Sequence, residues 1–249
     1  MGGLILIQGC NARETKYLAT KLLGQSHDNL NGYDFYKGNL GGVNVVVSET
    51  KIGTINTAVS TIVGINAYKP RIVLNIGTAD GHNASVHKGD VVIAQYAINA
   101  NAYMADNSTS NDLIHQKRWK MVTYDETTGE IKDEKGELIP SNFNLVNSAE
   151  ELIKPIAKQA VFTGTVISSD MWSKESDRID FFSDNFNSMC EDMSTYASAK
   201  VCTDNNVAFL GLRMISSEDP SDDLYETYAS EEIQRIVAQI LPELVKNFK

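Results

Sequence analysis

Carboxylate and hydroxyl side chains follow the apolar runs of this sequence, and they are the groups that could do chemistry. Glu14 comes shortly after the run Leu4–Gln8, and Thr78 and Asp80 follow the run Arg71–Gly77. Open α/β sheets bind ligands beyond the carboxyl ends of their strands, so carboxylates and hydroxyls at strand ends are the side chains expected to line a site. A carboxylate at a loop-to-helix junction can take a proton from water. Catalysis is therefore expected to rest on carboxylates and hydroxyls.

Other common catalytic motifs are missing from the sequence. It has no Walker-type phosphate loop, no Gly-x-Gly-x-x-Gly run after the first strand and no nucleophile elbow. The four histidines, His27, His82, His87 and His115, lack the spacing that would hold a metal ion, and each is interpreted as surface or core filler. We therefore expect neither a metal nor an organic cofactor.

The charge and the cysteine content of the sequence limit which partners the protein can bind and in which cell compartment it can reside. The 249 residues carry 22 basic and 32 acidic side chains, a net charge of −10. Such a surface repels phosphate backbones and anionic lipid, which argues against nucleic acid and membranes as partners. Three scattered cysteines make no disulfide framework, and the apolar run Leu4–Ile7 is too short for a signal peptide or a membrane span. We expect a cytoplasmic protein.

The elements that must position these side chains follow from hydrophobic periodicity. Near-continuous apolar runs rich in β-branched residues predict strands covered on both faces at Leu4–Gln8, Val43–Ser48, Arg71–Gly77, Asp90–Ile98, Val161–Ser168 and Val207–Ile215. Helical patterns occupy Ala12–Leu23, Thr54–Ala67, Asp192–Asn205 and Glu231–Phe248. This alternation predicts an α/β fold of one domain, residues 1–249, in which a three-layer α/β/α sandwich surrounds a central mixed sheet.

The polar stretch Asn99–Asn142 interrupts the alternation. Its centre, Asp125–Gly136, is rich in charged and turn residues, which predicts a long insertion or excursion loop with room for a small hairpin. Two interpretations stay open for this stretch. It is either a solvated surface loop or an element of a lid or a dimer interface.

Four segments, in order, resemble one protein family. The first three are Ile5–Glu14, Lys51–Ala58 and Val73–Gly81, and the fourth lies in the C-terminal third and comprises Gly164–Ser173, Cys190–Ala197 and Leu212–Asp219. Together they resemble the nucleoside phosphorylase/nucleosidase family, most closely the 5′-methylthioadenosine/S-adenosylhomocysteine nucleosidases. The resemblance covers the whole chain except Asn99–Asn142. It implies a homodimer and a partner ligand that is a purine nucleoside or a purine base.

The resemblance assigns roles to the first three segments. Glu14 occupies the place of the general base that activates water, whereas on its own it would be interpreted as a first-turn helix acid. Ile52 and Gly53 match the turn that contributes to the pocket for the sugar and its 5′ substituent. Thr78 and Ala79 match the turn that binds water and ribose in nucleosidases, or phosphate in phosphorylases.

Further positions extend the expected pocket. Asp80 replaces a glycine of the family pattern, and a carboxylate there would repel phosphate, which favours a hydrolase over a phosphorylase. Trp172, next to Ser173, matches the aromatic residue that stacks on the purine, although a large aromatic side chain could also be core. Asp192 and Met193 match the acid-methionine pair beside the ribose.

Two positions depart from the family pattern. Arg213 and Ser216 fit the run Arg-x-Ile-Ser-Asp, but Ser217 stands where the aspartate donates a proton to purine N7. Ser194 stands where a glutamate grips the ribose hydroxyls. A serine does not deliver a proton at neutral pH, and loss of a positioned general acid costs about 10²–10⁴ in rate.

A neighbouring acid could compensate for these two departures. Glu218 and Asp219 directly follow Ser217, and Glu191 lies near the expected ribose site. Three functions therefore stay open: a purine nucleoside hydrolase with Glu14 as base, a binding protein that turns over slowly or not at all, and a phosphorylase or 6-oxopurine nucleosidase.

Overall fold

The computed structural model describes residues 3–105, 119–133, 136–171, 173, 175–218 and 227–248. The described residues form six helices: α1 (Ala12–Lys21), α2 (Thr54–Tyr68), α3 (Phe143–Ile153), α4 (Ser176–Phe186), α5 (Thr195–Asp204) and α6 (Thr227–Asn247). Their strands are β1 (Ile5–Gly9), β2 (Leu23–Leu30), β3 (Tyr33–Leu40), β4 (Val43–Glu49), β5 (Ile72–Gly81), β6 (Val91–Asn99), β7 (Tyr103–Ala105), β8 (Trp119–Met121), β9 (Thr123–Tyr124), β10 (Ile131–Asp133), β11 (Leu138–Pro140), β12 (Val161–Ser168), β13 (Ser188–Asp192) and β14 (Ala208–Ser217). None of the helices in these ranges is both long and apolar enough to cross a membrane.

Ten of the described strands form one mixed sheet. Its order is β11-β6-β12-β13-β5-β1-β4-β3-β2, and β14 pairs with both β5 and β6. The strands β5, β14, β6, β12 and β13 therefore close into a ring, in which the β13–β5 and β14–β6 pairs are antiparallel. The predicted mixed central sheet is confirmed. The closure of part of that sheet into a ring was not predicted.

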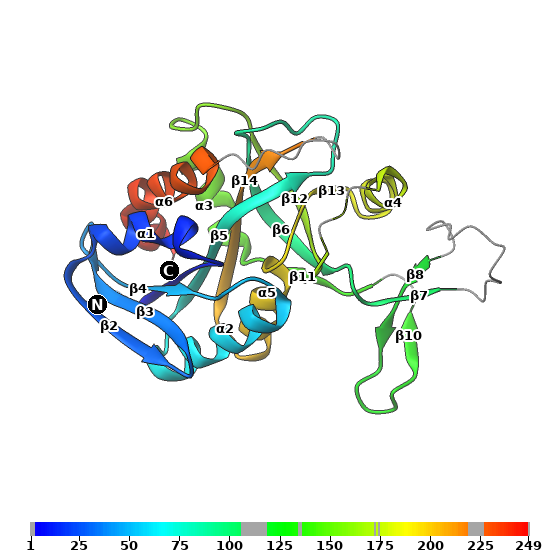
Figure 1. Ribbon diagram of the computed structural model, residues 1–249, viewed down its shortest axis with the longest axis horizontal. Helices are drawn as coiled ribbons and strands as arrows, with labels where there is room; N and C mark the ends of the chain where they lie inside the picture. The colour runs from blue at the N-terminus through cyan, green and yellow to red at the C-terminus, as the bar shows by residue number, and fades with distance from the viewer. Residues whose placement is uncertain are drawn as a thin grey trace.

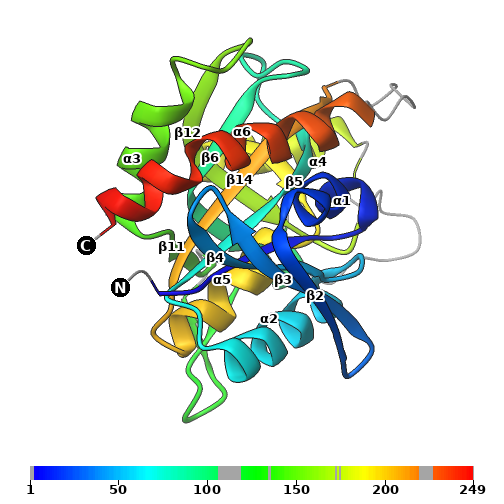
Figure 2. The same cartoon turned by 90° about the vertical axis from the view of Figure 1, so that its left-hand side faces the viewer.

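Helices cover both faces of the sheet. Figures 1 and 2 show α1, α3 and α6 together on one face, and α2 and α5 on the other. Successive side chains of β1 point to opposite faces of the sheet, so they pack against both helical layers. Ile5 and Ile7 pack in the same buried cluster as Leu18 of α1, whereas Leu6 packs in the opposite cluster with Ile65 of α2. Double-sided burial of this kind explains why β1 has an unbroken apolar sequence.

Several elements differ from the sequence prediction. The hairpin of β2 and β3, the helices α3 and α4, and the strand β13 were not predicted. The helix predicted from Asp192 begins instead at Thr195, because Asp192 is the last residue of β13. Its carboxylate accepts hydrogen bonds from the backbone N–H groups of Ser194 and Thr195 at 3.2 and 3.0 Å, so it satisfies donors at the start of the helix that have no partner within it.

The Asn99–Asn142 excursion is more structured than a loop. Its described residues contain the antiparallel pairs β7–β8 and β9–β10, followed by β11, which joins the main sheet antiparallel to β6. Figure 1 shows β7, β8 and β10 extending away from the main body of the structure. The prediction of a small hairpin was correct, but the excursion ends as an edge strand of the sheet.

Candidate functional site

A cavity of about 830 Å³ opens beyond the carboxyl ends of β1, β5 and β14. It brings together many of the residues singled out in the sequence: Glu14, Ile52, Thr78, Ala79, Asp80, Glu191, Asp192, Met193, Ser194, Arg213 and Ser216. Among the described residues, the rest of its lining consists of Cys10, Asn11, Ala12, Arg13, Gly77 and Met171. All of these lie within a few residues of a predicted site residue. The motifs themselves were therefore the signal that could have located them.

Glu14 is fixed on the wall of this cavity by backbone donors. Its side chain is buried, and Oε1 accepts hydrogen bonds from the Thr78 N–H at 2.8 Å and the Thr78 hydroxyl at 3.2 Å. Oε2 accepts a hydrogen bond from the Cys10 N–H at 2.8 Å. A Cβ atom on Gly77 would lie 2.7 Å from Oε1, so the close approach of strand and carboxylate requires glycine there. Oε1 accepts two of these hydrogen bonds and Oε2 accepts one, so Oε2 is the oxygen that keeps acceptor capacity for a water molecule.

Arg213 has all of its donors engaged inside the protein. Nε donates to Asp192 at 2.6 Å, and Nη1 donates to the carbonyl oxygens of Asn75 and Leu212 at 2.9 and 2.8 Å. Nη2 donates to the Asn75 side chain and, at 2.8 Å, to the Ser194 hydroxyl. A guanidinium group has five N–H donors, so this network leaves none for a further anion.

Asp192 is the anionic centre of the same network. It accepts hydrogen bonds from the hydroxyls of Ser168 at 2.5 Å and Thr195 at 2.6 Å, in addition to the Arg213 contact. Burial alone would raise the pKa of Asp192, but the Arg213 charge and these hydrogen bonds outweigh it and lower the pKa. The ionised carboxylate therefore anchors Arg213, and Ser194 contributes its hydroxyl to this network.

Comparison with known proteins agrees with this geometry. The model of the phosphorylase superfamily matches residues 4–248. This chain belongs to the phosphorylase superfamily. The 5′-methylthioadenosine/S-adenosylhomocysteine nucleosidase of Geobacillus sp. (strain WCH70) is 27% identical to it over 217 residues, which cover 85% of this chain and 84% of the relative.

Two solved structures show the same fold. The nucleosidase of this type from Colwellia psychrerythraea 34H, in complex with adenine, has a TM-score of 0.78 at 21% identity and covers 98% of this chain and 96% of its own. The futalosine hydrolase of Helicobacter pylori strain 26695 has a TM-score of 0.77 at 22% identity, and the match covers 99% of this chain and 98% of the hydrolase chain. This chain therefore shares its overall fold with both structures.

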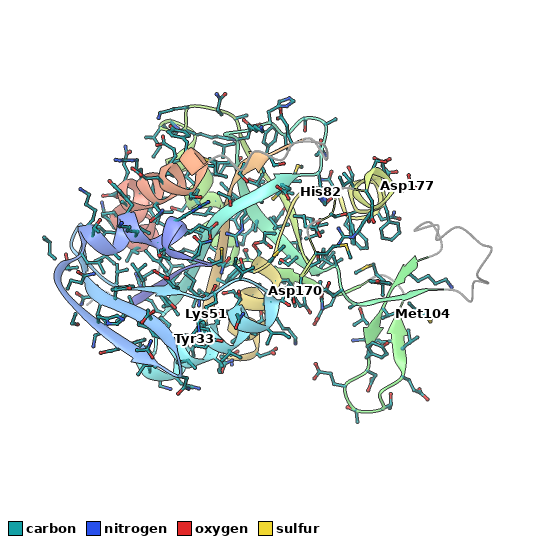
Figure 3. All side chains as sticks on the ribbon, viewed as in Figure 1. Tyr33, Lys51, His82, Met104, Asp170 and Asp177 are labelled. Carbon is teal, nitrogen blue, oxygen red and sulfur yellow. The ribbon has the colours of Figure 1, made fainter. Side chains whose placement is uncertain are left out.

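A second buried group of charges surrounds Glu191 on the cavity wall of this superfamily member. The Glu191 carboxylate contacts Arg178 at 2.7 Å and His82 at 3.2 Å, and it accepts a hydrogen bond from the Ser169 hydroxyl at 2.5 Å. Figure 3 shows His82 on the side of the sheet that faces α4, the helix that carries Arg178. Burial would raise the pKa of Glu191, but hydrogen bonding and the neighbouring positive charges lower it. Glu191 is therefore held ionised.

Two of the predicted residues, Gly53 and Ser173, are not part of the cavity lining. Gly53 has a φ of 103°, which favours glycine, and precedes α2. Its close approach is to Asp170, whose carboxylate accepts hydrogen bonds from the Thr54 N–H and hydroxyl, both at 2.6 Å. Figure 3 shows Asp170 beside the helices α2 and α5. Ser173 is buried, and its hydroxyl has no hydrogen-bond partner within the described part of the chain.

Two of the remaining candidate residues, Ser217 and Glu218, lie at the end of β14. Ser217 is buried in register with Asp80 of β5 and does not line the cavity. Glu218 also lies outside the lining, and its carboxylate binds the His87 ring at 3.1 Å and the Lys88 N–H at 2.8 Å. Trp172 and Asp219 lie outside the described residues.

Cys10 is the one cysteine on the cavity wall formed by the described residues. Burial, reinforced by the Glu14 charge and a hydrogen bond to that carboxylate, raises the pKa of its thiol far above the ordinary value. The thiol therefore stays protonated, which leaves Glu14 as the basic group beside it.

Proposed function

We propose that the protein hydrolyses the N-glycosidic bond of a purine nucleoside of the 5′-methylthioadenosine/S-adenosylhomocysteine type and releases the base. The observation that carries this proposal is the Glu14 carboxylate, held at 2.8 Å from the N–H groups of both Cys10 and Thr78 on the cavity wall. The named activity of the relatives supports the same reaction. A carboxylate fixed by two backbone donors can accept a proton from water without moving.

In the proposed reaction one bond to the anomeric carbon forms and one breaks. The water oxygen forms a bond to the anomeric carbon while its proton passes to Glu14, and the bond between that carbon and the purine nitrogen breaks. The electron pair of the broken bond leaves with the base, which takes up a proton. Met193 lies on the wall of the cavity beside Asp192 and is proposed to contact the ribose. The base is proposed to lie toward the segment that includes Trp172 and Ser216.

Water rather than phosphate is proposed as the nucleophile. The cavity lining includes four acidic residues, Glu14, Asp80, Glu191 and Asp192, and an anion placed among carboxylates is repelled. The five donors of Arg213 are already engaged. Both observations favour hydrolysis over phosphorolysis.

The proposed active form is a single-domain chain paired with a second copy in the cytoplasm. Apolar side chains near the cavity mouth are exposed, with Ile52 at 60% and Ile55 at 74%, and a partner that covers them would close the 5′ end of the pocket. An Ile55→Glu variant tests this assembly by sedimentation. A wild-type chain that sediments as a monomer at micromolar concentration would exclude the homodimer.

The proposed function is tested by release of free purine. Methylthioadenosine, adenosylhomocysteine, adenosine and inosine are incubated with the protein, with and without phosphate, beside the Glu14→Gln variant. We expect release that is independent of phosphate and that falls by about 10²–10⁴ in the variant. Release only with phosphate would identify a phosphorylase. Absence of release, together with thermal stabilisation by a nucleoside, would leave a binding protein.

A further inference from the structure

A buried group of charged side chains on the cavity wall has no part in the proposed bond cleavage. Glu191 lines the cavity, whereas Arg178 and His82, which contact its carboxylate, do not. All three residues are buried, with 5% of Glu191, 1% of Arg178 and 4% of His82 exposed. A buried ion pair seldom stabilises a fold more than apolar side chains of the same volume would. Stability alone therefore does not account for this group, and Glu191 is the member that reaches the cavity.

The Glu191 carboxylate has room for one hydrogen-bond donor from a ligand. Its Oε2 contacts the Arg178 guanidinium at 2.7 Å and the His82 ring at 3.2 Å. Within the described part of the chain, its Oε1 accepts one hydrogen bond, from the Ser169 hydroxyl at 2.5 Å. A carboxylate oxygen can accept two hydrogen bonds, and an ionised carboxylate has no proton to donate. Oε1 can therefore take one N–H or O–H donor, and it rejects a group that presents only lone pairs.

Strand pairing places Glu191 on the base side of the proposed nucleoside. Glu191 pairs in register with Asp80, and directly opposite residues on antiparallel strands share one face of the sheet. Asp80 follows Thr78 by two residues on β5, so with a rise of about 3.3 Å per residue this pair lies roughly 6–7 Å farther along the strand. The Thr78 hydroxyl meets Glu14 at 3.2 Å. A nucleoside whose anomeric carbon faces Glu14 would therefore place the far edge of its base near Glu191.

We propose that Glu191 selects the base by accepting a hydrogen bond from the 6-amino group of an aminopurine nucleoside. This inference rests on the proposed function for the position of the nucleoside in the cavity. The Ser169 hydroxyl that holds Oε1 lies three residues before Trp172, in the segment toward which the base is proposed to lie. A 6-oxopurine would bring a carbonyl oxygen to the same point, where two acceptors would face each other without a hydrogen between them. Glu191 is thereby a specificity-determining residue of the cavity.

The test compares two substrates that differ at position 6 of the base. Methylthioadenosine carries the amino group, and 5′-methylthioinosine carries an oxo group in its place. We expect the wild-type kcat/KM to favour methylthioadenosine, and the ratio of the two kcat/KM values to fall by about 10–100-fold in Glu191→Gln. The amide of glutamine has both an N–H donor and a carbonyl oxygen, so it can pair with either base. Dividing the ratio of the variant by that of the wild type cancels the intrinsic reactivity of the bases and any fraction of unfolded protein.

Glu232→Gln is the matched control. Glu232 also pairs with a basic side chain, Lys158 at 2.9 Å, and its own side chain is mostly buried, with 14% exposed. It does not line this cavity. We expect the Glu232→Gln variant to keep the wild-type ratio.

Binding of the free bases gives a second readout that needs no turnover. We expect calorimetry to show that the wild type binds adenine more tightly than hypoxanthine. In Glu191→Gln this preference should shrink by at least about tenfold, because the amide accepts either base. The folded fraction of the variant sets the number of sites and leaves the ratio of the two dissociation constants unchanged.

The outcomes distinguish this inference from the proposed function. Hydrolysis with a ratio that is unchanged in Glu191→Gln, or that changes as much in Glu232→Gln, would overturn the role of Glu191 and leave the proposed hydrolase intact. A wild type that prefers methylthioinosine would overturn it as well. No hydrolysis of either substrate, with a preference for adenine that depends on Glu191, would overturn the hydrolase and support base selection by Glu191.

Discussion

Gly77 offers a direct test of how the Glu14 carboxylate is placed. In Gly77→Ala, the added methyl carbon lies 2.7 Å from Oε1 and 2.9 Å from Cδ of Glu14. The carboxylate must then retreat by roughly 0.8 Å to reach an ordinary contact distance of about 3.5 Å. Because Oε1 is bonded to the Thr78 N–H and hydroxyl, this retreat breaks the contacts that orient the base.

The substitution is expected to lower both activity and stability. A displacement of about 1 Å at a reacting group costs about 100-fold in rate, which is about 2.7 kcal/mol of transition-state stabilisation. The atoms that yield are the flexible end of a side chain, and the φ of Gly77 is not positive. The backbone itself is not strained, and the lost hydrogen bonds of the buried carboxylate should lower the free energy of unfolding by about 1–3 kcal/mol.

The assay compares kcat/KM for base release with the denaturant midpoint in the same preparations. Gly81→Ala is the matched control, since it lies in the same strand and its added carbon meets no atom closer than 3.4 Å. We expect the control to keep both activity and stability. Full activity in Gly77→Ala would refute the reasoning, because it would show that the observed position of Glu14 is not needed for the reaction.

Three further predictions concern the surroundings of the site. Asp170→Ala removes the acceptor for the Thr54 N–H and hydroxyl and should lower the free energy of unfolding by about 0.5–2 kcal/mol in denaturant titrations; an unchanged midpoint would contradict its capping role. Arg213→Met leaves Asp192 buried without its positively charged partner and should lower the free energy of unfolding by about 3–5 kcal/mol in the same titrations. A decrease below about 1 kcal/mol would show that the other hydrogen-bond donors are enough to stabilise the Asp192 carboxylate. The pKa values of Glu191 and Asp192 lie below their ordinary values of 4.5 and 3.8, so their contribution to stability is present above those pH values and is lost as the pH falls through the lower folded-state values. Glu191→Gln should flatten that acid dependence, and a pH profile equal to the wild type would contradict it.

Burial on two faces made much of the sheet predictable. Ile5, Leu6 and Ile7 are all buried because successive side chains face different helical layers, and this leaves an unbroken apolar run in the sequence. The strand β2, Leu23–Leu30, was missed because it lies on an edge, where six of its eight residues are exposed and no apolar pattern arises. Its pairing with β3 depends on backbone hydrogen bonds, and these cannot be recognised from the types of its side chains.

The candidate site was predictable only as far as its motifs extend. Glu14 and Thr78 were located by their resemblance to family motifs, and the structure brings their side chains into contact. The pairing of Asp80 with both Ser217 and Glu191 was not predictable, because it depends on strands that lie more than a hundred residues apart in the sequence. The sequence interpretation treated Asp80 only as a deterrent to phosphate.

The ring of strands also bears on the order in which the protein folds. It closes only when residues 208–217 pair with residues 72–80, and contacts between such distant segments form late because a long loop must first be ordered. Arg213 and Ser216 are carried by that last strand. A growing chain therefore has no complete cavity until β14 has been synthesised, and a ligand that needs the cavity binds only after folding of the sheet is complete. Nucleosides should then act on the native state and leave the folding rate unchanged.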